Sequence, residues 1–117
     1  MFQAPIALGS TTGIVAPTAA PTSPTDGYDL RDQRFAQLWI GIAGGTSAQV
    51  AVYLLGPAGW IAYTDVPPTT FLTADGGGVV QIEPRGALRC YVRVLALAGG
   101  ETVAIHAQGV TLSLIHI

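Results

Sequence analysis

The side chains that could carry out catalysis or hold a metal are few and widely separated in this sequence. It contains two histidines, His106 and His116, one cysteine, Cys90, and seven carboxylates in 117 residues. One cysteine excludes a cysteine-based zinc site and an intramolecular disulfide. His106 has no second histidine at a metal-ligand spacing, and we expect it on the exposed face of a strand. These residues predict no metal site.

The carboxylates and glycines do not suggest an active site either. Five of the seven carboxylates lie in expected turns or in a linker, and nothing indicates that the other two, Asp65 and Glu83, share a cleft. The glycine-rich residues 75–78 lie between expected strands, whereas a phosphate-binding loop precedes the N-terminus of a helix. We therefore expect that the protein is not an enzyme and needs no cofactor.

Charged residues are unusually scarce. Asp, Glu and Arg make up 10% of the chain, there is no lysine, and the mean hydropathy is +0.48. Soluble domains average about 25% charged residues, so this chain should expose apolar surface of the kind that marks contact faces. Five arginines and a net charge of −2 argue against nucleic-acid binding.

Neither a signal peptide nor a membrane span is expected, because no long apolar run is present.

The N-terminal region differs in composition from the rest of the chain. Residues 1–27 are rich in Pro, Thr and Ala, which favours an extended, polyproline-like chain. The region is either a disordered tail or an arm that docks on a neighbouring subunit, and we favour the arm because of its apolar side chains. Residues 26–34 carry five of the twelve charges and are interpreted as a solvated hinge, or as a polar contact with a partner. We expect an arm and linker over 1–34, with these candidate anchors: Phe2, Ile6, Leu8, Ile14 and Val15.

From residue 35 to 117 the chain reads as one all-β domain. Apolar residues alternate with polar ones over 36–42, 48–55, 88–94 and 102–108, and glycine or proline stands at nearly every break. The turns at 56–59 and 98–101 each predict a hairpin. The pattern predicts a small antiparallel β-sandwich or jelly roll, with no helix longer than one turn. The expected core residues are Leu38, Ile40, Val50, Val52, Leu54, Val80, Ile82, Leu88, Cys90, Val92, Val94, Val103 and Ile105.

Five aromatic residues offer the best candidate for ligand binding. Trp39, Tyr53, Trp60, Tyr63 and Tyr91 could together form a platform for a sugar. Trp39 and Tyr53 are equally well explained as a cross-strand pair or as anchors for a protein partner, and Tyr91 is a further candidate for partner binding. Both interpretations remain open from the sequence.

Several segments resemble small β-sandwich virion proteins of tailed phages. The resemblance rests on a strand at 48–55 followed by the W-x-x-Y strand at 60–63, on an F-x-T-A-D-G turn at 71–76, and on 89–94 with 101–105. It covers about residues 48–108. It implies a capsid decoration or cement protein at the capsid surface, with the major capsid protein or other virion subunits as partners, homo-oligomers, and no catalytic residues. The alternatives are another head or tail accessory protein and a carbohydrate-binding module.

The last six residues, 112–117, have two interpretations. They alternate as a final strand would, and they also resemble the translation of an adapter used in DNA sequencing libraries. We assign no function to His116 for this reason.

Overall fold

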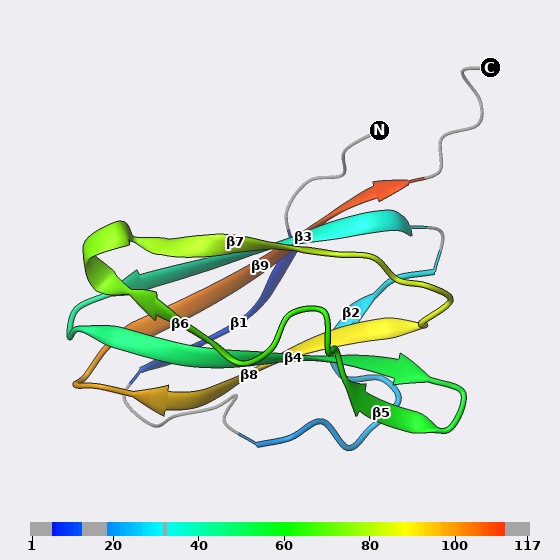
Figure 1. Cartoon of the computed structure of the whole chain (residues 1–117), viewed down its shortest axis with the longest axis horizontal. Helices are drawn as coiled ribbons and strands as arrows, with labels where there is room; N and C mark the ends of the chain where they lie inside the picture. Colours follow the sequence, from blue (N-terminus) through cyan, green and yellow to red (C-terminus); the bar gives the residue numbers. More distant parts are fainter. Residues whose placement is uncertain (1–5, 13–18, 32, 112–117) are drawn as a thin grey trace.

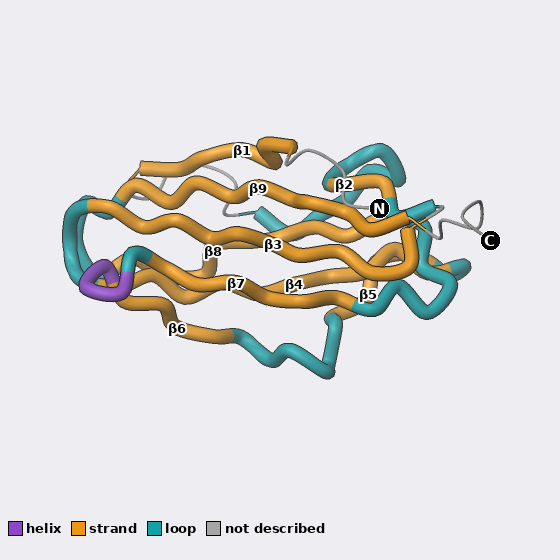
Figure 2. Tube along the Cα trace, turned by 90° about the horizontal axis from the view of Figure 1, so that it is seen from above, coloured by secondary structure: helices purple, strands orange, loops and turns teal. Residues whose placement is uncertain are grey.

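The computed structural model describes residues 6–12, 19–31 and 33–111, and the side chains of 19–31 and 33–109. These residues form two antiparallel sheets packed face to face, which confirms the predicted β-sandwich (Figure 1). Within the described part of the chain the only helix is the single 3₁₀ turn η1, Thr73–Asp75, which lies at one end of the sandwich (Figure 2).

The first sheet has four strands. Its order is β1 (Ile6–Thr12), β9 (Thr102–Thr111), β3 (Gln33–Ala43) and β7 (Gly77–Ile82). Strand β3 is central, and its residues alternate between buried and accessible along its length. That alternation is the period of two that the sequence shows.

The second sheet has five strands. Strand β8 (Arg89–Leu97) lies between β2 (Tyr28–Asp29) and β4 (Ser47–Gly56). The other edge of β4 pairs with β5 (Gly59–Ala62) along one half and with β6 (Thr69–Leu72) along the other. The turn between β4 and β5 forms the hairpin that the sequence predicts.

The hairpin expected between β8 and β9 is wrong. Strand β8 pairs with β4 and β2, whereas β9 pairs with β3 and β1 in the opposite sheet. Residues 98–101 therefore cross from one sheet to the other. Alternation alone cannot distinguish the two connections, since both place the same apolar faces inward.

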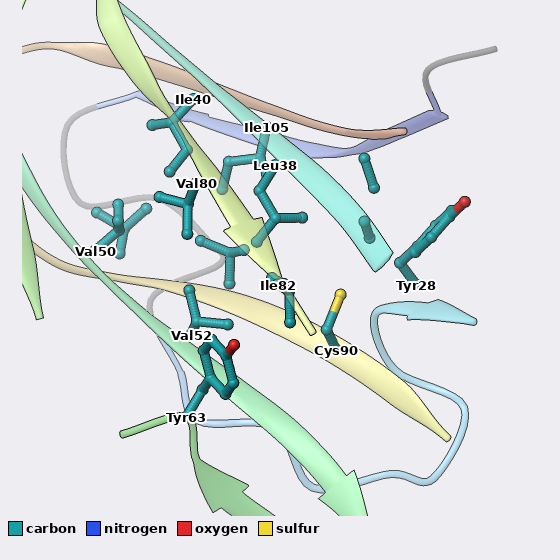
Figure 3. Packing of buried hydrophobic residues seen from close by; sticks show 14 of the residues in the cluster. Tyr28, Leu38, Ile40, Val50, Val52, Tyr63, Val80, Ile82, Cys90 and Ile105 are labelled. Atoms are coloured by element: carbon teal, nitrogen blue, oxygen red, sulfur yellow. The ribbon is translucent and has the colours of Figure 1, made fainter. Parts of the chain in front are cut away.

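The core lies between the two sheets, and most of it was predicted. Figure 3 shows residues of both sheets meeting there, such as Val52 of β4 and Ile105 of β9. All the expected core residues are buried except Leu88, which is 46% exposed. A bend at Leu88 interrupts the alternation before β8 begins, and Ala87 packs against the core. Further buried residues are Tyr28, Leu30, Ala36, Ile42, Ala48, Tyr63 and Ala107.

Part of the N-terminal region belongs to the sandwich. Strand β1 pairs with β9 of the same chain, in register from Ile6 opposite Ala107 to Thr12 opposite Thr102. Tyr28 and Leu30, inside the expected hinge, are 5% and 1% exposed and belong to the core. The packed domain therefore begins before residue 35, because these two apolar residues turn inward between their charged neighbours.

Candidate functional site

The five aromatic residues proposed as one platform are divided by the fold. Tyr63 is buried between the sheets, where its hydroxyl oxygen accepts a hydrogen bond from the N–H of Glu83 at 3.1 Å. Trp39 lies on the outer face of the four-stranded sheet. Tyr53, Trp60 and Tyr91 lie on the outer face of the five-stranded sheet. No single platform of five rings exists.

The three rings on the five-stranded sheet form a compact cluster. Tyr53 and Tyr91 are opposite each other on β4 and β8, with ring centroids 6.4 Å apart in an edge-to-face arrangement. Trp60 meets Tyr91 in the same way at 6.0 Å. Arg93 donates a hydrogen bond to the Tyr53 hydroxyl at 3.2 Å. Edge-to-face pairs of this kind add about 0.5–1.5 kcal/mol beyond the area they bury.

Residues 19–27, which we call the strap, lie across this aromatic cluster. Tyr91 donates its hydroxyl proton to the carbonyl oxygen of Ala19 at 2.9 Å, and the indole N–H of Trp60 donates to that of Ser23 at 3.0 Å. Burial raises the pKa of Tyr91, and the charge of Asp26 raises it further, so the hydroxyl stays a neutral donor.

Arg89 holds the other end of the strap. Its guanidinium donates to the carbonyl oxygens of Asp26 and Gly27, both at 2.7 Å. Pro21, which lies between the anchored residues Ala19 and Ser23 in the sequence, is buried. All four hydrogen bonds run from side chains of the sheet to main-chain oxygens of the strap, so they depend little on the strap's side chains. An aromatic surface that receives an extended proline-rich segment is a known mode of peptide recognition.

Two aspartates, one within the strap and one just after it, are bound by other groups of the same chain. The Asp26 carboxylate accepts hydrogen bonds from the backbone N–H groups of Thr22 and Ser23 at 3.1 and 3.0 Å and closes a turn. Asp29 forms a two-point ion pair with Arg31. This hydrogen bonding lowers the pKa of Asp29 to about 2. Both aspartates thus have partners within the chain.

Glu101 is a buried carboxylate at the end of the sandwich, in the crossing from β8 to β9. Its side chain accepts hydrogen bonds from the N–H of Thr46 at 2.7 Å and of Gly99 at 3.1 Å. Burial raises the pKa of Glu101, but backbone N–H groups of Thr46, Glu101 itself, Gly99 and Ser47 lower it by more, so the net shift is downward. The carboxylate is fully engaged with the backbone, which indicates a structural role.

Neither the thiol nor a cluster of potential metal ligands forms a site among the described residues. Cys90 faces the core, and burial raises its pKa to about 12, so it is a poor nucleophile. Among the described residues, no group of three or more His, Cys, Asp or Glu side chains is placed to hold a metal ion. No helix in the described part of the chain is long and apolar enough to cross a membrane.

The candidate partner-binding residues do not lie together on one surface of the described structure. Tyr53 and Tyr91 belong to the strap-covered cluster, whereas Trp39 is 43% exposed on the opposite sheet. Ile6 and Leu8 lie within β1. Three other candidate anchors lie outside the described residues: Phe2, Ile14 and Val15.

Two structural features were not anticipated from the sequence. The surface that holds the strap needs Trp60 and Arg89 as hydrogen-bond donors. The available signal in the sequence was a proline-rich segment in a chain that also contains four tyrosines and two tryptophans. Glu101 was assigned to a turn, because a single glutamate that follows two glycines gives no indication in the sequence that it is buried. Comparison of the chain with protein-family models, curated proteins and solved structures finds no match.

Proposed function

We propose that the protein is a non-enzymatic structural subunit of a tailed-phage virion, of the type that decorates or cements the capsid surface. The resemblance of residues 48–108 to small virion proteins supports this function, and so does the scarcity of charge. Its partners would be the major capsid protein or other virion subunits, and further copies of itself.

The way in which the N-terminal region attaches is the main support for this proposal. Strand β1 is held by main-chain pairing with β9, and the strap is held through its carbonyl oxygens by Trp60, Tyr91 and Arg89. Neither contact depends on which copy supplies the segment. Exchange of an identical element between subunits is a low-cost route to assembly. An arm with such contacts can dock on a neighbour and tie two subunits together.

Edge pairing offers a second way to join neighbours. Strands β1 and β7 form the two edges of the four-stranded sheet. An edge strand presents unpaired N–H and C=O groups, which can extend the sheet into another chain. With few charges to oppose close approach, a cement protein can combine strand addition with apolar contacts.

A particle-binding experiment tests this function. Capsids assembled from the major capsid protein of the same phage genome are mixed with the full chain, and bound protein is measured by cosedimentation. We expect saturable binding of the wild type. Replacing the five candidate anchors by serine should abolish it: Phe2, Ile6, Leu8, Ile14 and Val15.

A matched control replaces polar residues of the same segment, Gln3, Ser10 and Thr12, by alanine, and this variant should bind like the wild type. If the serine variant decorated capsids with undiminished affinity, the arm would not be the clamp. If the wild type bound no capsid at any concentration, the virion function would be wrong.

A further inference from the structure

The outer face of the four-stranded sheet carries three ordered rows of side chains. Strand register places Val79, Trp39 and His106 side by side across β7, β3 and β9. A second row lies two residues away from the first along each strand. It consists of Gln81, Gln37 and Gln108. On the other side the third row is Gly77, Gly41 and Ala104. An indole thus stands between a row of amides and a row with almost no side chains.

Trp39 is held at the centre of this face and remains accessible. Its side chain is 43% exposed, and its indole N–H donates to Oε1 of Gln108 at 3.3 Å across the neighbouring strand. The hydrogen bond fixes the orientation of the ring on the sheet. An accessible indole held in a fixed orientation offers a flat apolar face on which a ligand ring can stack.

The row of small residues opens a shallow hollow beside the indole. Its volume is about 300 Å³, and Trp39, Gly41, Gly77 and Val79 line it together with Asp75 at the rim. Val79, on the same side, is 49% exposed. A ligand that lies in this hollow would touch one face or edge of the indole and would have a carboxylate within reach.

The polar groups of the face favour a neutral ligand. The three rows contain no Asp, Glu, Lys or Arg, and their polar side chains are three amides and one imidazole. An amide both donates and accepts hydrogen bonds, which suits hydroxyl groups and does not select a charge. A few oriented polar groups around an aromatic surface are typical of small-ligand sites.

We propose that this face binds a neutral oligosaccharide, with Trp39 stacking on the apolar face of one sugar ring. Gln37, Gln81 and Gln108 hydrogen-bond to hydroxyl groups of the adjoining ring, and the glycine hollow gives the sugar room beside the indole. The aromatic cluster of the other sheet is not this site, because the strap covers it. The capsid proposal does not depend on this site, which lies on the sheet opposite the strap.

Isotope-edited nuclear magnetic resonance of the full chain tests this site. ¹⁵N-labelled protein is titrated with cellotetraose, maltotetraose and tetra-N-acetylchitotetraose, and the indole N–H resonances of Trp39 and Trp60 are followed separately. We expect one of these neutral sugars to shift the Trp39 indole and the side-chain amide of Gln108, and to leave Trp60 in place. Trigalacturonate, an anionic sugar, should bind less tightly than that neutral sugar.

Two substitutions separate binding from folding. Trp39→Ala should weaken binding about tenfold or more, the loss expected for one aromatic stacking contact. Gly41→Val keeps the indole and should cause a similar loss by filling the hollow, and the site tolerates it because a Cβ there would meet only the Ala104 oxygen at 3.8 Å. Trp60→Phe is the control and should change the affinity by less than about twofold.

The outcomes are distinct. Loss of binding in both Trp39→Ala and Gly41→Val, with Trp60→Phe unaffected, supports the site. The proposal is overturned if none of the three neutral sugars causes a shift at about 10 mM, or if the shifts are confined to Trp60. A dissociation constant well above about 10 mM is too weak for specific recognition. Capsid binding by Gly41→Val is measured in parallel, so failure of either proposal is recognised separately.

Discussion

Glu101 accepts a hydrogen bond from the backbone N–H of Thr46 at 2.7 Å, across 55 positions of sequence. This contact joins the crossing between β8 and β9 to the crossing between β3 and β4. Gly45, with φ of +55°, comes so close that a Cβ there would collide with the Glu101 carboxylate. One buried side chain thus holds together two of the connections between the sheets, and only glycine fits against it.

The stability of the protein should fall in acid, and Glu101 should contribute to the fall. Its pKa is lower in the folded chain than its ordinary value of 4.5, so the unfolded chain binds the proton more tightly. The stabilisation is present above pH 4.5 and is lost as the pH falls through the folded pKa. Glu101→Gln should lower the melting temperature at pH 7 and flatten its dependence on pH below 4.5.

Thermal unfolding from pH 7 to pH 2 measures this effect. Glu83→Gln, an exposed carboxylate, serves as the control and should follow the wild type. Parallel pH curves for Glu101→Gln and the wild type would show that the carboxylate does not stabilise the fold through its charge. Asp29, whose pKa is lowered to about 2 by Arg31, contributes acid sensitivity of the same sign.

The hydrogen bonds from the sheet to the strap should each contribute measurable stability. Trp60→Phe removes the donor to Ser23, and Tyr91→Phe removes the donor to Ala19, while both variants keep a ring in place. Each should lower the free energy of unfolding by about 1 kcal/mol, as expected for one hydrogen bond. Urea unfolding measures the loss. Trp39→Phe, on the other sheet, is the control: it loses only the exposed hydrogen bond to Gln108 at 3.3 Å and should cost less than either strap variant. An equal loss there would point to general effects of aromatic substitution.

Cys90 should be unreactive in the folded protein. Burial raises its pKa to about 12, so almost no thiolate exists at pH 8, and the thiol is shielded from reagents. Labelling with an aromatic disulfide reagent should be slow in the native state and fast in 6 M guanidinium, where the chain is unfolded. Fast labelling of native protein would contradict the buried position of Cys90.

The sequence predicts which side chains turn inward better than it predicts which strands pair. Alternation in β3, β4, β8 and β9 is a local property, and nearly every expected core residue is buried. The partner of a strand depends on distant segments, so the β8–β9 crossing was mistaken for a hairpin. Leu88 was misplaced for a related reason, because the bend before β8 shifts the alternation by one position.

The candidate sites were harder to predict than the core. Trp39, Tyr53 and Tyr91 were selected as contact residues from their type and their position opposite the apolar face of each expected strand. Only the division of the strands into two sheets shows that Trp39 lies on the other side of the sandwich from Tyr53 and Tyr91. The glutamine row arises from residues 37, 81 and 108, which are remote in sequence. The strap depends on side chain to main-chain hydrogen bonds, which leave no pattern in the sequence.

Replacement by alanine should lower the free energy of unfolding more at core positions than at the bend before β8. Ile105, on β9, is 1% exposed, and Leu88 is 46% exposed. Ile105→Ala should lower the free energy of unfolding by about 2–4 kcal/mol, because it removes buried methyl groups and leaves a cavity, and Val92→Ala should cost about 1–3 kcal/mol. Leu88→Ala should cost less than about 1 kcal/mol, since half of its surface is already in water.

Urea unfolding of the three variants, followed by circular dichroism, gives these values. Ile105→Val is a graded control and should cost about 1 kcal/mol, because only one methyl group is lost. The loss in free energy of unfolding should be largest for Ile105→Ala, smaller for Val92→Ala and smallest for Leu88→Ala. This order would agree with a core between β9 and β8 that does not include Leu88. A loss for Leu88→Ala as large as that for Ile105→Ala would restore Leu88 to the core and contradict the bend before β8.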